Sequence, residues 1–109
     1  MKYIFILILF FTGGEAFTQI TAKHFNAEWN TTNDVKWFMD LSECKTKGYI
    51  DIGKSPDDAK KYKIAVVPTI IIFKDGEEEL RFQADLSFRM VSTKKEVQEA
   101  IDELLMSDF

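Results

Sequence analysis

Hydrophobic and polar residues follow two periods along the chain, and these periods predict an alternation of strands and helices. Residues 18–29 alternate in part, which predicts a strand that enters a central position in a sheet. Residues 70–73 are apolar on both sides, which is typical of a central strand covered on both faces. A short strand is predicted at residues 49–52, and a half-exposed antiparallel strand at residues 80–84.

Three helices are predicted between these strands. The first begins at Asp34, after the turn formed by residues 30–33, and runs to about Cys44. The second covers residues 55–62, where Ser55 caps the helix and Pro56 takes its first position. The third follows a capping box of Thr93 and Glu96, and its apolar positions fall on one face: Val97, Ala100, Ile101, Leu104 and Leu105.

The order of these elements predicts the fold class. Residues 74–77 form a strong hairpin turn, because Gly76 accepts a positive φ. A parallel βαβ unit is therefore followed by a crossover to a hairpin and closed by a helix. The sequence predicts an α/β fold with a mixed sheet of about four strands flanked by helices.

The N-terminal segment differs in composition from the rest. Lys2 precedes an eight-residue apolar run at residues 4–11, and small residues follow at Gly14 and Ala16. This pattern predicts a signal peptide over residues 1–16 and a domain over residues 17–109. The run is shorter than the about 20 residues that span a membrane, so membrane contact would be transient and the product exported, either periplasmic or secreted. A buried strand and an uncleaved anchor are the alternatives.

Charge and cysteine content exclude several classes of function. The 109 residues carry a net charge of -4 and no long cluster of lysine and arginine, which argues against a nucleic-acid partner. One cysteine and one histidine leave no intramolecular disulfide and no Cys-rich zinc site. We therefore expect no cofactor and no metal.

Three stretches carry a resemblance to a known family. Phe25-Asn26-Ala27-Glu28-Trp29 is similar to F-W-A-E-W, residues 62–69 to Y-G-I-R-G-I-P-T, and residues 70–77 to L-L-L-F-K-N-G-E. In this order and spacing, the stretches resemble the thioredoxin family over most of residues 17–106. The resemblance implies a thioredoxin-like fold truncated at the N-terminus, since the family's first strand and first helix are missing.

The departures from the family pattern bear on function. Asn30 and Asn33 stand where the family has its two cysteines, so thiol–disulfide exchange at this site lacks both thiols. His24 and Tyr49 fall at or near the positions of the family's buried acid and its basic partner. We expect His24 to be a core or edge-strand histidine satisfied by a neighbour, and the chain not to be an enzyme. Asn30, Thr31 and Thr32 also match an N-glycosylation sequon.

The surviving Pro68 indicates a binding surface. In the family this proline is cis and its strand edge binds extended chains, so the resemblance implies a groove for a protein partner. The predicted binding residues are Trp29, Asn30, Thr31, Asn33, Val67 and Pro68. The resulting hypothesis is a redox-inactive protein-binding or assembly module. The alternatives are a thiol–disulfide oxidoreductase acting through Cys44 and a structural subunit of a larger assembly, such as that of a virus.

Overall fold

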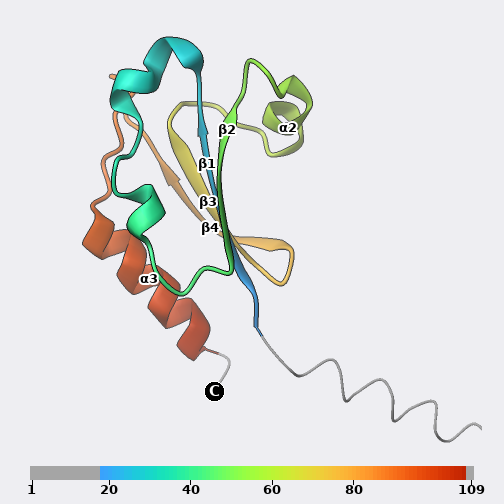
Figure 1. Ribbon diagram of the computed structural model, residues 1–109, viewed down its shortest axis with the longest axis vertical. Coiled ribbons are helices and arrows are strands. Elements are labelled where there is room, and N and C mark those ends of the chain that lie inside the picture. The colour runs from blue at the N-terminus through green and yellow to red at the C-terminus, as the bar shows by residue number, and fades with distance from the viewer. Residues whose placement is uncertain (1–17, 108–109) are drawn as a thin grey trace, which may run out of the picture.

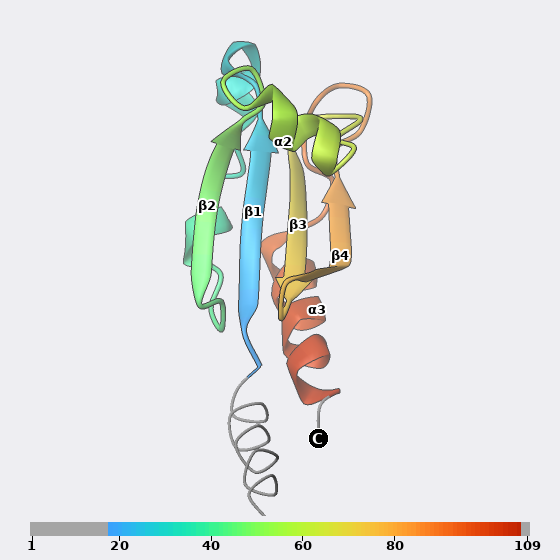
Figure 2. The ribbon, with the colours of Figure 1, turned by 90° about the vertical axis from the view of Figure 1, so that its right-hand side faces the viewer.

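Four strands form one mixed sheet in the computed structural model, which describes residues 18–107 (Figures 1 and 2). The strand order is β2-β1-β3-β4, with β1 at Ile20–Asn26, β2 at Thr46–Asp51, β3 at Thr69–Lys74 and β4 at Glu77–Gln83. β1 pairs parallel with β2 and antiparallel with β3, and β3 pairs antiparallel with β4. This arrangement confirms the predicted α/β fold and its sheet. The predicted signal peptide lies outside the described residues.

Successive side chains of the strands point to opposite faces of the sheet and pack into two separate hydrophobic cores, one on each face. On one face, Ile20, Ala22, Ile70 and Ile72 pack with Val97 and Ile101 of helix α3 (Lys94–Met106). On the other face, Phe25, Ile71 and Phe73 pack with Tyr62 and Ile64, which follow the short helix α2 (Pro56–Lys61). Figure 1 shows the two helices on opposite sides of the sheet. β3 is buried along Thr69–Phe73, as expected for an inner strand.

The predicted helix over residues 34–44 is wrong. A 3₁₀ segment, η1 at Glu28–Asn33, precedes this stretch, and within it only a second short 3₁₀ segment forms, η2 at Phe38–Asp40. Asp34 and Leu41 have extended backbone angles (ψ 143° and 137°), which interrupt any helix between them. The buried residues of this stretch, Val35, Phe38 and Leu41, recur every third position. That spacing suits a 3₁₀ geometry, in which residues three apart eclipse one another, better than an α-helix.

Three local predictions are confirmed. Asp75 and Gly76 form a two-residue hairpin loop with φ of 51° and 89°, between the paired residues Lys74 and Glu77. Both bonds of the predicted capping box are made by Thr93 and Glu96 at the start of α3. Pro56 occupies the first turn of α2, but Ser55 before it makes no side-chain hydrogen bond to the helix, so the predicted serine cap is wrong.

Candidate functional site

The loops that follow β1 and β2 and precede β3 meet at one end of the sheet (Figure 1). β1 and β2 are parallel, so η1, which follows β1, and the segment after Asp51, which follows β2, start at the same end of the sheet. β3 starts at this end of the sheet because it runs antiparallel to β1. The loop after β4 also lies at this end, where a bridge between Ala84 and Met90 closes it. This end of the sheet carries all six residues predicted to form the site.

An amide cluster occupies the centre of this end. The Asn30 side-chain nitrogen donates to Asn26 Oδ1 at 3.0 Å, and it lies 3.1 Å from the Phe88 carbonyl oxygen and 3.5 Å from that of Val67. Asn26 Nδ2 in turn donates to the Asn30 carbonyl at 3.0 Å and to Asp34 Oδ1 at 2.6 Å. Because Asn30 is 5% exposed, these bonds satisfy an amide that water hardly reaches.

Asn33 joins this cluster from the outside. Its Nδ2 donates to Asn30 Oδ1 at 2.8 Å, so the two residues at positions i and i+3 touch through their side chains. Amides are neither nucleophilic nor ionisable, so this pair binds and orients rather than reacts. The burial of Asn30 also argues against the N-glycosylation sequon in the folded chain.

The side chains of Val67 and Pro68 are buried at this end of the sheet rather than exposed to solvent. Val67 is 4% exposed, Pro68 is fully buried, and the peptide bond between them is cis. The Pro68 carbonyl accepts a hydrogen bond from the Ala84 N–H at 3.0 Å. The predicted contribution of Val67 and Pro68 to a binding groove stays a prediction, and their buried side chains leave backbone groups as their means of contact. The Val67 carbonyl oxygen lies 3.5 Å from the Asn30 side-chain nitrogen.

Trp29 is the large apolar group that this end presents to solvent. It is 68% exposed, and its ring meets the Phe88 ring edge to face at a centroid distance of 5.1 Å. Phe88 is 40% exposed and has a φ of 63°, an uncommon conformation for a bulky residue. Its carbonyl bond to Asn30 holds that conformation. Leu86, in the same loop, is 89% exposed, and we call Trp29, Leu86 and Phe88 the Trp29 patch.

The sequence pointed to Trp29 but missed Phe88 and Leu86. No strand or helix is predicted from the sequence for residues 85–91. The available signal was the presence of four large apolar residues, Leu86, Phe88, Met90 and Val91, in a seven-residue loop. Thr31, which follows Asn30, is exposed, and Asn33 is half-exposed. Together with Trp29, Thr31 and Asn33 form the accessible part of the predicted site.

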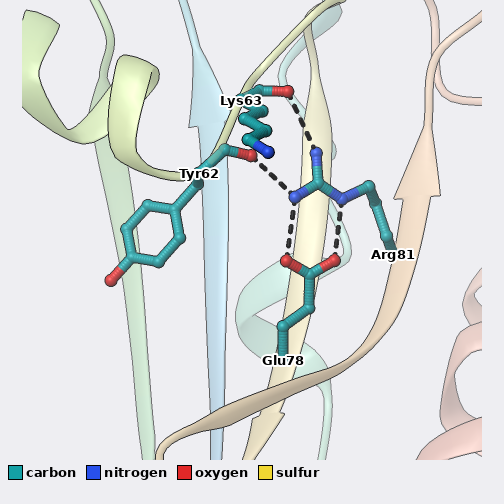
Figure 3. Close-up of polar contacts among 4 residues, drawn as sticks. All are labelled: Tyr62, Lys63, Glu78 and Arg81. Atoms are coloured by element: carbon teal, nitrogen blue, oxygen red, sulfur yellow. Dashed lines mark hydrogen bonds and ion pairs between the residues drawn. The ribbon is translucent and has the colours of Figure 1, made fainter.

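A side chain from β4 fixes the segment that leads into Val67 and Pro68. Figure 3 shows that Arg81 donates to the carbonyl oxygens of Tyr62 and Lys63, at 2.7 and 3.2 Å, while both of its other contacts go to Glu78. The Glu78 carboxylate accepts two bonds of 2.9 Å, and this pairing lowers the pKa of Glu78. The bidentate geometry orients the guanidinium toward both carbonyls.

His24 is a core residue, as expected, but only one of its ring nitrogens is satisfied, because Nδ1 is buried without a hydrogen-bond partner among the described residues. It is 1% exposed, and its Nε2 accepts the Val35 N–H at 3.0 Å. The rings of Tyr49 and Phe38 lie 4.5 and 5.3 Å from its ring, and Tyr49 is its register partner on β2. Burial lowers the pKa of His24, and the nearby Asp34 only partly opposes this effect.

Two pockets open near these residues. One, of about 210 Å³, is lined in part by His24, Thr31, Asp34, Tyr49 and Asp51. The other, of about 400 Å³, is lined by Trp29 together with Glu28, Ile52 and Lys54 among others. Trp29 thus has an open pocket on one flank and the Phe88 ring on the other.

Cys44 lies at the opposite end of the sheet. It precedes β2, whereas Asn30 follows β1, and the two strands are parallel. Cys44 is half-buried, and burial raises the pKa of its thiol. As the chain's single cysteine it forms no CxxC pair.

Within residues 18–107 no three histidine, cysteine, aspartate or glutamate side chains are grouped to hold a metal ion. In the same part of the chain, the helices are too short or too polar to cross a membrane.

Comparisons with known proteins agree with this geometry. A stretch of 42 residues, 38% of the chain, is 48% identical to thioredoxin Y1, chloroplastic, from Arabidopsis thaliana, and spans 24% of that protein's length. No family model matches the chain.

Solved structures of thioredoxins extend the likeness to most of the chain. The reduced thioredoxin pre-protein of Schistosoma mansoni superposes with a TM-score of 0.61 at 25% identity, covering 78% of each chain. A mutant thioredoxin from Halobacterium salinarum gives a TM-score of 0.61 at 16% identity, covering 80% of this chain and 75% of its own. The chain therefore has the thioredoxin fold, and its single cysteine leaves it without a cysteine pair.

Proposed function

We propose that this domain is a redox-inactive protein-binding module that contacts its partner through the Trp29 patch. The observation that carries the proposal is the exposure of Trp29, 68%, beside an aromatic ring held in place by a buried amide. Exposed aromatic groups on a rigid support are common anchors of protein interfaces, because they bury a large area at a small cost in conformational entropy.

The chemistry of the neighbouring residues supports binding rather than reaction. Asn30 and Asn33 replace a thiol pair with hydrogen-bonded amides, and Cys44 lies at the far end of the sheet. A thioredoxin-2 with a TM-score of 0.59 to this chain is described as a component of the protein secretion machinery of a malaria parasite, so the fold also occurs within assemblies.

Affinity capture with Trp29→Ala tests the partner surface. Met106→Ala is the matched control, because Met106 is 67% exposed but lies in α3, outside the Trp29 patch. A partner captured by the wild type should bind Trp29→Ala at least about fivefold more weakly, which corresponds to about 1 kcal/mol, and should bind Met106→Ala unchanged. Captured proteins that bind Trp29→Ala as tightly as the wild type would refute the proposed surface.

A redox assay tests the other half of the proposal. The purified protein should not accelerate the reduction of insulin by dithiothreitol, and Cys44→Ser should behave as the wild type does. Turnover that disappears in Cys44→Ser would favour an oxidoreductase instead.

A further inference from the structure

The two edges of the sheet differ in how they are protected against pairing with another strand. Figure 2 shows β4 at one edge and β2 at the other. β4 starts with three exposed glutamates, Glu77, Glu78 and Glu79, of which Glu78 is paired with Arg81. Such a charged edge opposes the addition of a further strand. β2 has no comparable run of like charges.

The outer side of β2 presents backbone N–H groups that pair with no described strand, whereas the Asp51 carbonyl on this side already accepts the N–H groups of Lys54 and Ser55 at 3.1 and 2.9 Å. The register with β1 and the bond from the Ile52 N–H to the Asn26 carbonyl place the even-numbered residues of β2 toward β1. Lys47, Tyr49 and Asp51 therefore direct their backbone N–H groups away from the sheet, and no other described strand pairs with this side.

Residues 47–51 of β2 are complementary in charge and size to a second copy of the same segment that runs in the opposite direction. In an antiparallel pairing across a two-fold axis at Tyr49, Lys47 faces the partner subunit's Asp51, and the same contact recurs on the other side of the axis. Gly48 then faces the partner subunit's Ile50, and a Cβ placed on Gly48 would meet nothing within 4 Å, which leaves room for the isoleucine.

The side chains at the axis can make these contacts without giving up their present ones. The Lys47 ammonium donates to the carbonyls of Met39 and Leu41, both at 2.6 Å, and keeps a third N–H. Asp51 Oδ1 accepts from the Gly53 N–H at 2.8 Å, so Oδ2 stays available. Tyr49 is 49% exposed and brings an aromatic ring to its counterpart.

We propose that two copies of this chain pair through their β2 strands, antiparallel and centred on Tyr49, to form one continuous sheet. The interface is distinct from the Trp29 patch, which lies on the loops at one end of the sheet. It therefore goes beyond the proposed partner-binding function, and Trp29→Ala should leave it intact.

Sedimentation equilibrium of the full chain and its charge-reversal variants tests the pairing. The wild type should dimerise, and Lys47→Glu or Asp51→Lys should each weaken the dimer about tenfold or more by placing like charges opposite one another. The double variant Lys47→Glu/Asp51→Lys should restore the affinity to within about threefold of the wild type. Lys61→Glu, on α2, is the control and should have no effect. Circular dichroism should show that each variant is folded.

Cross-linking tests the register even if a charge variant fails to fold. Residues of a hydrogen-bonded antiparallel pair lie about 5.5 Å apart at Cα, which a disulfide can span. In a Cys44→Ser background, Tyr49→Cys should give a disulfide-linked dimer with oxidised glutathione, whereas Glu79→Cys on the other edge should not. A monomer at every concentration, a dimer insensitive to both single reversals, or equal cross-linking at the two edges would overturn the proposal.

Discussion

Acidification should destabilise this domain through His24, the single histidine of the chain. Burial against Phe38 and Tyr49 lowers the pKa of His24 in the folded state, while the unfolded chain keeps a pKa of about 6.5. Below pH 6.5 the unfolded chain therefore binds a proton that the folded chain resists, so the free energy of unfolding falls as the pH falls. The loss begins near pH 6.5 and levels off once the pH has passed the folded-state pKa.

The size of this effect follows from one proton. The free energy of unfolding should change by at most about 1.4 kcal/mol per pH unit in this window. For a domain of this size each lost kcal/mol lowers the melting temperature by about 4–8 °C. Carboxylates titrate at lower pH, which leaves the interval between about pH 5 and 6.5 to His24.

Urea unfolding at half-unit steps from pH 5 to 8, together with the NMR titration of the His24 ring, measures the effect. His24→Gln is the control, because a side-chain carbonyl can still accept the Val35 N–H but does not titrate over this interval. The variant should show a flat stability profile between pH 5 and 6.5, whatever its absolute stability. A His24 pKa at or above 6.5, or an equal slope in the variant, would refute the reasoning.

Three further predictions concern the supports of the fold and the site. Arg81→Lys should lower the free energy of unfolding by about 1 kcal/mol, because a lysine cannot bind Glu78 and two carbonyls together; chemical denaturation measures this, and an unchanged midpoint contradicts it. Asn30→Cys with Asn33→Cys, in a Cys44→Ser background, should form a disulfide under mild oxidant because the two side chains meet; free thiols by mass spectrometry would show that the turn is misplaced. Thr93→Ala should cost about 1 kcal/mol through loss of the cap on α3, and full stability in thermal unfolding would exclude that contribution.

The strands and the capped helix could be predicted because their signals are local. The apolar run of β3, the hairpin loop at Asp75 and Gly76, and the capping box of Thr93 each lie within a few residues. The segment after Asn33 could not be predicted in the same way. Its apolar residues fit a helix in part, but the hydrogen bond from the Val35 N–H to His24, eleven residues earlier, fixes a different path.

In the candidate site too, the features set by local sequence could be predicted, and those set by contacts between distant loops could not. That Asn30 and Asn33 face each other follows from their spacing, whereas Trp29 is predicted at the end of a strand and lies instead in η1, where it is exposed. The Pro68 carbonyl accepts the Ala84 N–H, and Asn30 meets the Phe88 carbonyl across 58 positions of sequence. Contacts between loops so distant in sequence leave no periodic pattern.

The amide cluster around Asn30 also determines how this end of the molecule responds to its surroundings. Its hydrogen bonds join β1, η1, and the loops that carry Val67 and Phe88, and none of them involves a thiol. An amide has no oxidised and reduced forms, so these contacts are the same at any thiol–disulfide potential. A partner that docks beside Trp29 would meet the same amide cluster in an oxidising compartment as in a reducing one, so this cluster adds no dependence on thiol–disulfide potential to binding.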